Sequence, residues 1–370
     1  MVTSSVATQK QKEIVSDHFD LPVMRPTLPT FGEVEPWLRL MDQSQVYSNF
    51  GPLVSEVEMR YSTFLNVPPD QLVTVSSCTL GLQGAVQISE CSQWVVPNFT
   101  FSATGLAVLN AGKTLLLGEV NEATWALDES VVEGLQAGTG IVPVMPFGSP
   151  IDLASWPSDH AVIVDAAASL GTQPDLSNLP ESWAVVFSLH ATKVMPCGEG
   201  GLVVFGNPES AREFRQWSNF GFNDTRSSIR VGSNAKMSEI HAAYGLASHE
   251  SWPRESREWL KAQSLVAELS LSPKDVDARK RLLTPNPYWN VDCGDGVRRA
   301  RLEARLKEAR ISSRVWWQRP LDAMEPFRHA PVIGSRGVAA NLAARVLGLP
   351  MFRGIQERDI QAIEEVFQTV

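Results

Sequence analysis

The sequence contains few cysteines, and they do not form a metal-binding or disulfide pattern. Its four cysteines, Cys78, Cys91, Cys197 and Cys293, are scattered over 370 residues without a C-x-x-C spacing. This excludes a disulfide-stabilised scaffold and an iron–sulfur or zinc centre built on cysteine pairs. We therefore expect no metal, and a reduced, cytoplasmic setting.

Long apolar runs and clusters of positive charge are also missing. No apolar run is long enough to span a membrane, and Lys10 and Lys12 are not followed by the apolar segment of a secretion signal. The formal net charge of -9 disfavours nucleic acid as a partner, because phosphate contacts need clustered Lys and Arg. A small anionic substrate is still allowed, since a pocket sets its own local charge.

The composition that is present, 44% hydrophobic and 20% charged, is that of a soluble globular enzyme. A chain of 370 residues is long enough for a large domain and a smaller one. We predict a loosely held leader at 1–20, a large domain at 21–251 and a small C-terminal domain at 252–370. The second boundary is placed where Pro253 and a shift toward charged helical segments interrupt the earlier pattern.

Short apolar segments alternate with helical ones over the first two thirds of the chain. Strands are expected at 72–76, 94–97, 113–120, 140–148, 161–168, 184–187 and 201–206, with helices near 31–42, 54–65, 297–309 and from about 238 and 357. This alternation predicts an α/β fold with a mostly parallel, doubly wound sheet. Because ligands bind at the carboxyl ends of such strands, the polar residues that follow them are candidates for a site.

Two strand ends carry residues suited to one kind of cofactor. Lys193 follows the apolar run 184–187, and a lysine amine can form a Schiff base with an aldehyde when its pKa is lowered. Asp165 ends another run, where a buried carboxylate needs a cationic partner such as a protonated pyridine nitrogen. Each also has an ordinary interpretation, a solvated loop lysine and a helix N-cap. The convergence of several polar strand ends on one edge favours a site.

A third strand is followed by a turn that opens a helix, S-S-C-T-L-G-L at 76–82. The first N–H groups of a helix have no internal partner and can bind a phosphate. Ser77 and Thr79 add hydroxyl groups, although either could simply be an N-cap. Phe101, just after the strand at 94–97, could stack on a planar ring or belong to the core.

Taken together, these stretches resemble the DegT/DnrJ/EryC1/StrS sugar aminotransferase family of pyridoxal-phosphate (PLP) enzymes. The resemblance runs from about residue 21 to the end, and it is most specific in F-S-L-H-A-T-K (187–193) with G-E-G-G (198–201), G-S-N-A-K-M-S-E-I-H-A-A-Y-G-L (232–246) and the closing L-G-L-P-M-F-R-G-I-Q-E-R-D-I (347–360). It implies the aspartate-aminotransferase fold, fold type I, with a mostly parallel seven-stranded-type sheet in the large domain and a smaller α+β C-terminal domain.

The same resemblance implies a role for each matched residue. Lys193 would form the Schiff base and shuttle the proton, Asp165 would pair with the pyridinium nitrogen, and Phe101 would stack on the ring. The phosphate would be held by Cys78, Thr79, Leu80 and Ser188. Asn234, with Lys236 beside it as a further candidate, would reach this phosphate from the neighbouring subunit, so the resemblance implies a homodimer with composite sites. Candidates for substrate contacts are Ser48, Asn49, His190 and Lys236, together with the loops 47–53 and 226–230. The residues of these two loops could equally be ordinary loop residues that do not contact a substrate.

The resemblance further implies that L-glutamate donates an amino group to a nucleotide-linked keto-sugar. The subgroup that it most resembles makes dTDP-4-amino-4,6-dideoxyglucose from dTDP-4-keto-6-deoxyglucose. Other keto-sugars or a cyclitol remain alternatives, as do a PLP-dependent sugar dehydratase and a catalytically silent relative. Because Lys193 and Asp165 are both present, transamination is the favoured prediction.

Four positions depart from the pattern of the family. Cys78 stands where relatives usually have glycine, and Ala168 where many have Gln or His beside the cofactor. Met145 and Phe147 replace a common His and Tyr. We expect the wall of the site to be more apolar as a result, without the loss of a group that the chemistry requires.

Overall fold

A computed structural model describes residues 19–223, 225–267 and 284–370 of the chain. The predicted leader at 1–20 lies almost wholly outside this part. The first described segment, at residues 19–30, is extended and runs along the C-terminal part of the chain. Leu21 pairs there with Ile311, and the carbonyl of Val23 accepts a hydrogen bond from the N–H of Met351 at 3.1 Å.

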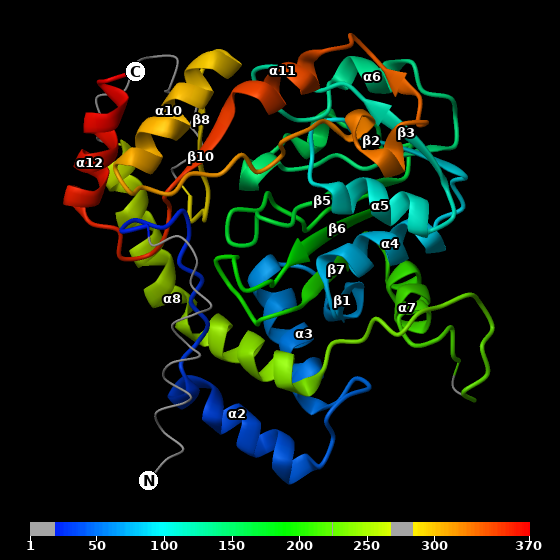
Figure 1. Cartoon of the computed structure of the whole chain (residues 1–370). Helices are drawn as coiled ribbons and strands as arrows, with labels where there is room; N and C mark the ends of the chain where they lie inside the picture. Colours follow the sequence, from blue (N-terminus) through cyan, green and yellow to red (C-terminus); the bar gives the residue numbers. More distant parts are fainter. Residues whose placement is uncertain (1–18, 224, 268–283) are drawn as a thin grey trace, which may run out of the picture.

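The centre of the molecule is a twisted sheet of eight strands in the order β1-β7-β6-β5-β4-β2-β3-β9 (Figure 1). The strands are β1 (Leu72–Val75), β2 (Gln93–Pro97), β3 (Thr114–Gly118), β4 (Thr139–Ile141), β5 (Val162–Asp165), β6 (Trp183–Ser188), β7 (Gly201–Phe205) and β9 (Val332–Ile333). In this spatial order, each neighbouring pair along β6-β5-β4-β2-β3-β9 is parallel. Strand β7 is antiparallel to both β6 and β1. The predicted α/β fold with a mostly parallel sheet is confirmed, and a strand from the C-terminal part extends it by one.

One predicted strand is much shorter than the sequence pattern indicates. The apolar run at 140–148 contributes only β4, and its end forms a 3-10 turn at Pro146–Gly148. Pro143 and Pro146 have no N–H to donate to a neighbouring strand, and Phe147 has a positive φ of 51°. The chain therefore leaves the sheet and places Met145 and Phe147 beside the site that is described below.

Helices cover the sheet, and a smaller group of elements lies beside it (Figure 1). The helices are α2 (Phe31–Ser44), α3 (Pro52–Leu65), α4 (Cys78–Ile88), α5 (Ser102–Asn110), α6 (Glu129–Glu133), α7 (Pro208–Trp217), α8 (Glu239–Ala267), α10 (Gly296–Glu308), α11 (Val338–Arg345) and α12 (Glu357–Phe367). In the C-terminal part, the antiparallel strands β8 (Trp289–Asp292) and β10 (Val346–Leu349) pair with each other. Figure 1 shows this pair together with α10 and α12 at one end of the long helix α8.

Helix α8 connects the two parts of the chain. It continues through Pro253, and the predicted domain boundary at 251/252 lies within it. Its first half packs against α2 and α3, and it also contacts α12. Because the same helix contacts elements of both parts, it fixes the position of one part against the other.

Alternate residues of the strands face two different layers of core. Val73, Val186 and Val203 pack with the layer that contains α4 and α7, whereas Leu72 and Val185 belong to the opposite layer. Side chains of a strand point alternately to the two faces of a sheet, so both faces of these strands must be apolar. This explains why the strands read as continuous apolar runs in the sequence.

Two buried glutamates fix helix ends near the sheet. Glu239 is fully buried, and its carboxylate accepts hydrogen bonds from the N–H groups of Leu53 (2.7 Å) and Val54 (3.1 Å) in the first turn of α3. Glu119, at the end of β3, accepts one from Ala339 (3.0 Å) in the first turn of α11. A carboxylate at these positions satisfies N–H groups that have no helical partner. The two contacts anchor α3 and α11 to the rest of the fold.

Within the described residues, no helix is both long and apolar enough to cross a membrane.

Candidate active site

A cavity of about 480 Å³ lies at the carboxyl ends of β5 and β6. This volume falls in the range of small-molecule sites. The residues that the sequence predicted for the site and that line this cavity are Cys78, Thr79, Phe101, Asp165, Ser188, His190 and Lys193. They come from segments separated by more than one hundred residues, and the strand order brings them to one edge of the sheet.

Lys193 lies in the connection between β6 and β7, which is closed by backbone hydrogen bonds. The N–H of Ala191 donates to the carbonyl of Gly198 at 2.8 Å, and that of Lys193 to the carbonyl of His190 at 2.9 Å. The Nζ atom of Lys193 donates a hydrogen bond to the hydroxyl oxygen of Tyr288 at 2.9 Å. The lysine amine is therefore held at a defined point in the cavity.

The electrostatic surroundings of Lys193 act in opposite directions on its pKa. Burial lowers the pKa of the amine, but Tyr288, which accepts its hydrogen bond, and the nearby carboxylate of Asp165 raise it, and the net shift is upward. In the absence of a bound aldehyde the amine is thus kept protonated. This differs from the lowered pKa that the sequence argument required, and the difference is due to Tyr288, which the sequence did not place in the site.

Asp165 ends β5 and is only 6% exposed. Its Oδ2 atom accepts a hydrogen bond from the hydroxyl of Thr104 in α5 (2.8 Å), and Oδ1 accepts one from the N–H of Ala167 (3.2 Å). Burial raises the pKa of this carboxyl above its usual value, although these hydrogen bonds and Lys193 oppose the shift. A buried carboxylate with a raised pKa lacks a fully compensating cation, so the site is suited to a ligand that brings one.

The first turn of α4 forms one wall of the cavity. Ser77 is the N-cap, and its side chain accepts a hydrogen bond from the N–H of Leu80 at 3.3 Å. Cys78 and Thr79 belong to the first turn of α4, so their N–H groups have no acceptor inside the helix. The positive end of the helix dipole favours an anion at this position. Gly201 allows this close approach, because a Cβ atom there would lie 2.9 Å from the N atom of Cys78.

Five of the predicted residues do not line the cavity within this chain: Ser48, Asn49, Leu80, Asn234 and Lys236. Ser48 and Asn49 are exposed in the loop between α2 and α3. Asn234 is also exposed, and its Oδ1 atom accepts a hydrogen bond from Lys236 Nζ at 2.7 Å. Asn234 thus lies on the surface of this chain, whereas Lys236 is partly buried.

Aromatic side chains complete the cavity, and three of them, Tyr288, Trp316 and Trp317, were not predicted as site residues. Phe147 stacks on Trp317, with ring centroids 3.9 Å apart and an angle of 21° between the planes. Tyr288 makes edge contacts with Phe147 (5.6 Å) and with Trp316 (5.2 Å). The expected apolar wall is therefore present. The adjacent Trp316 and Trp317 are a signal for this wall in the sequence, but only the fold shows that they line the same cavity as Lys193.

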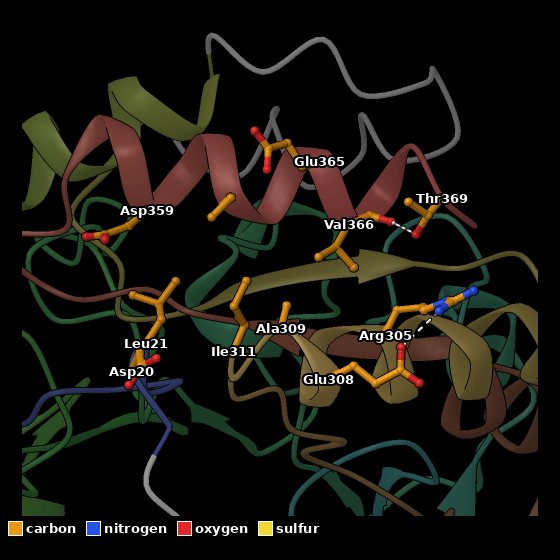
Figure 2. Close-up of a pocket in the computed structure, with 11 residues that line it drawn as sticks. Asp20, Leu21, Arg305, Glu308, Ala309, Ile311, Asp359, Glu365, Val366 and Thr369 are labelled. Atoms are coloured by element: carbon orange, nitrogen blue, oxygen red, sulfur yellow. Dashed lines mark hydrogen bonds and ion pairs between the residues drawn. The ribbon is translucent and has the colours of Figure 1, made fainter.

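A second cavity, of about 470 Å³, lies between α10 and α12, far along the chain from Lys193 (Figure 2). Its lining carries four carboxylate residues, Asp20, Glu308, Asp359 and Glu365. Among the described residues of this lining, Arg305 is the arginine, and it is paired with Glu308 at 2.9 Å. As far as the structure describes it, this lining is acidic and offers no unpaired lysine or arginine to an anionic substrate, so the first cavity is the candidate active site.

The residues of that first cavity fit pyridoxal phosphate. They offer an amine for the aldehyde, a buried carboxylate for the ring nitrogen, a helix N-terminus for the phosphate and an apolar wall for the ring. A mostly parallel sheet that presents this set at its strand ends defines a PLP-dependent transferase of fold type I.

Comparison with known proteins identifies the family. Residues 33–368 match the DegT/DnrJ/EryC1/StrS aminotransferase family, and the chain belongs to it. This confirms the family, the class of enzyme and the cofactor, pyridoxal phosphate, that the sequence motifs indicated.

Individual relatives differ in the sugar that their names specify. The chain is 31% identical to dTDP-4-amino-4,6-dideoxy-D-glucose transaminase from Shigella dysenteriae, over 62% of this chain and 64% of that protein. It is 28% identical to UDP-N-acetyl-3-dehydro-alpha-D-glucosamine 3-aminotransferase from Acidithiobacillus ferrooxidans, over 77% and 79%. The structure of DesI in the presence of its TDP-sugar product superposes with a TM-score of 0.83 at 29% identity, covering 96% of this chain and 94% of DesI.

Proposed function

We propose that this protein transfers an amino group from L-glutamate to a keto carbon of a nucleotide-linked sugar, with dTDP-4-keto-6-deoxyglucose as the acceptor. The observation that carries the proposal is the convergence of Lys193, Asp165 and the N-terminus of α4 on one cavity. The acceptor is inferred from the Shigella relative and from DesI. A 3-keto sugar nucleotide is the second candidate, because the Acidithiobacillus relative is named for that chemistry.

The residues of the cavity have different roles in this reaction. When bound, PLP supplies an electron sink that stabilises negative charge on the substrate carbon. Lys193 would hold the cofactor aldehyde through Nζ and would serve as the general acid and base for the substrate carbon. Asp165 would hold a proton on the ring nitrogen, and Thr104 orients its carboxylate through the 2.8 Å hydrogen bond.

The remaining contacts position the cofactor. Cys78, Thr79 and Ser188 lie where they can hold the phosphate, and Phe101, which is 60% exposed at the mouth of the cavity, can cover the ring. We further propose a homodimer in which Asn234 and Lys236 reach the phosphate of the neighbouring subunit, and the exposed position of Asn234 supports this. Nearby apolar side chains support this assignment, since Ile229 and Val231 are 56% and 76% exposed on the same loop.

The acceptor is tested by product analysis. Purified protein loaded with PLP is incubated with L-glutamate and either dTDP-4-keto-6-deoxyglucose or a UDP-linked 3-keto sugar, and the sugar products are identified by mass spectrometry. We expect an amino sugar and an equal amount of 2-oxoglutarate from the dTDP-linked substrate. Formation of product from the UDP-linked sugar alone would replace the first candidate with the second.

Tyr288 should control the pH at which Lys193 reacts with the cofactor. Only the neutral amine attacks an aldehyde, and Tyr288 raises the pKa of Lys193. Tyr288→Phe removes the hydroxyl that accepts the hydrogen bond, so the pKa of the lysine falls and a larger neutral fraction exists at a given pH. We expect the pH profile of the rate of PLP attachment, followed by absorbance, to move to lower pH. An unchanged profile in a folded variant would contradict this role.

A further inference from the structure

The charges that face the active-site cavity are few. Among the described residues that line it, the carboxylates are Asp165 and Glu199, and the lysine and arginine side chains are Lys193 and Arg314. Both proposed substrates are anions, and an anion loses hydration when it enters a cavity that also holds carboxylates. Lys193 is committed to the cofactor. Arg314 is therefore the cation within this subunit that remains for a substrate.

The backbone of Arg314 is firmly placed. It pairs with Gly348 of β10 in an antiparallel bridge, in which the N–H of Arg314 donates to Gly348 at 2.9 Å and the N–H of Gly348 donates back at 2.8 Å. The guanidinium lies over the ring of Trp316, 4.9 Å from its centroid. Within the described parts of the chain, no carboxylate forms an ion pair with it. An exposed arginine that is held in place but not neutralised is available to a ligand.

Trp316 connects the position of Arg314 to the reactive amine. It packs directly over Gly348, where a Cβ atom would lie only 2.1 Å from Trp316 Nε1, so this packing requires glycine. Trp316 also makes a T-shaped contact with Tyr288, with ring centroids 5.2 Å apart, and Tyr288 accepts the hydrogen bond of Lys193. A chain of packed side chains thus sets the guanidinium relative to the atom at which the reaction occurs.

From this arrangement we infer that Arg314 is the anion-binding residue of the substrate subsite. Its planar guanidinium can donate two parallel hydrogen bonds to a carboxylate or a phosphate group. The ligand group is the carboxylate of the amino donor or the diphosphate of the nucleotide-linked acceptor, which present the same kind of paired, negatively charged oxygens. The inference rests on the proposed function, and it adds a specificity-determining residue that neither the motifs nor the comparisons assign.

Two variants and a matched control test this subsite. Arg314→Gln removes the charge, Arg314→Lys keeps it without the planar fork, and Arg319→Gln removes a charge from the same segment outside the cavity. The PLP-loaded proteins are titrated by calorimetry with two probes that cannot react, glutarate for the donor and dTDP for the acceptor. Loss of a charged hydrogen bond predicts affinity for at least one probe about tenfold or more weaker in Arg314→Gln.

The pattern of losses identifies the ligand group. Weaker binding of glutarate alone assigns Arg314 to the donor carboxylate, and weaker binding of dTDP alone assigns it to the diphosphate. Weaker binding of both probes assigns Arg314 to both groups, which it would bind one after the other. Arg319→Gln should bind as the wild type does, and Arg314→Lys should recover part of the loss.

Equal affinities in Arg314→Gln and Arg319→Gln for every probe that the wild type binds would overturn the inference, and the proposed function would stand. A wild type that forms no covalent bond with PLP, or that binds neither probe, would instead remove the proposed function and the subsite with it.

Discussion

Lys193→Ala is expected to abolish amino transfer. The substitution removes both the atom that binds the cofactor aldehyde and the group that moves the proton, and general acid–base catalysis alone contributes up to about ten-thousandfold. The loss should therefore reach about ten-thousandfold or more. The rate of 2-oxoglutarate formation from L-glutamate measures it, in the presence of excess PLP and a keto-sugar acceptor.

A covalent label makes this result specific to Lys193. Borohydride reduction of the wild-type protein loaded with PLP should fix the cofactor on the peptide that contains Lys193, as shown by mass spectrometry after digestion. Lys261→Ala serves as the matched control, because Lys261 is an exposed lysine of α8 that does not line the cavity. Fixation at another lysine in the wild type, or retained turnover in Lys193→Ala, would show that the site is wrongly assigned.

Asp165→Asn should separate catalysis from stability. The neutral amide keeps the shape of the side chain but cannot hold a proton on the ring nitrogen. Because the loss of one partner of a buried pair costs about 3–5 kcal/mol, we expect turnover to fall by about a hundredfold to a few thousandfold. The turnover rates of the variant and the wild type with L-glutamate and the keto-sugar measure this fold-change.

The same variant should not destabilise the protein without cofactor. Burial raises the pKa of Asp165, so the folded chain binds a proton there more readily than the unfolded chain does. The ionised carboxylate therefore costs stability as the pH rises from the acidic range toward neutral, and asparagine removes this cost. At neutral pH the melting temperature of cofactor-free Asp165→Asn should equal or exceed that of the wild type, with a smaller gain on addition of PLP. A marked fall in the cofactor-free melting temperature would contradict this electrostatic account.

The sequence predicts the strands and the residues that follow them because both are local features. A strand that is buried on both faces of a sheet must be apolar on both faces, so β1, β2, β5, β6 and β7 are visible as short apolar runs. Asp165 ends one such run, and Lys193 follows another in the connection between β6 and β7. Parallel strands place their carboxyl ends at one edge, and that rule suffices to predict that these two residues meet.

The rest of the site depends on contacts between distant segments. Tyr288 lies 95 residues from Lys193 along the chain, and no local pattern indicates that its hydroxyl accepts the hydrogen bond of the lysine. Arg314 and Trp316 lie further still, in a segment whose position depends on the pairing with Gly348. The upward pKa shift of Lys193 could not be predicted for the same reason, since its sign depends on Tyr288.

The departures from the family pattern have a structural explanation in part. Phe147 turns out of the sheet with a positive φ and stacks on Trp317, so the replacement of a polar side chain is matched by an aromatic partner. At Cys78, burial raises the pKa of the thiol well above its usual value, and the side chain is neutral beside the helix N-terminus. The backbone N–H of this residue is still available for a phosphate.

The most direct test of the central claim is the visible absorption spectrum of the purified protein with PLP, recorded before and after addition of L-glutamate. The account predicts a band from PLP bound through Lys193, its disappearance with glutamate, and its return on addition of dTDP-4-keto-6-deoxyglucose. If wild-type protein saturated with PLP shows no such band, Lys193 does not bind the cofactor and the proposed function is wrong. A band that forms but does not respond to glutamate would contradict the proposed amino donor.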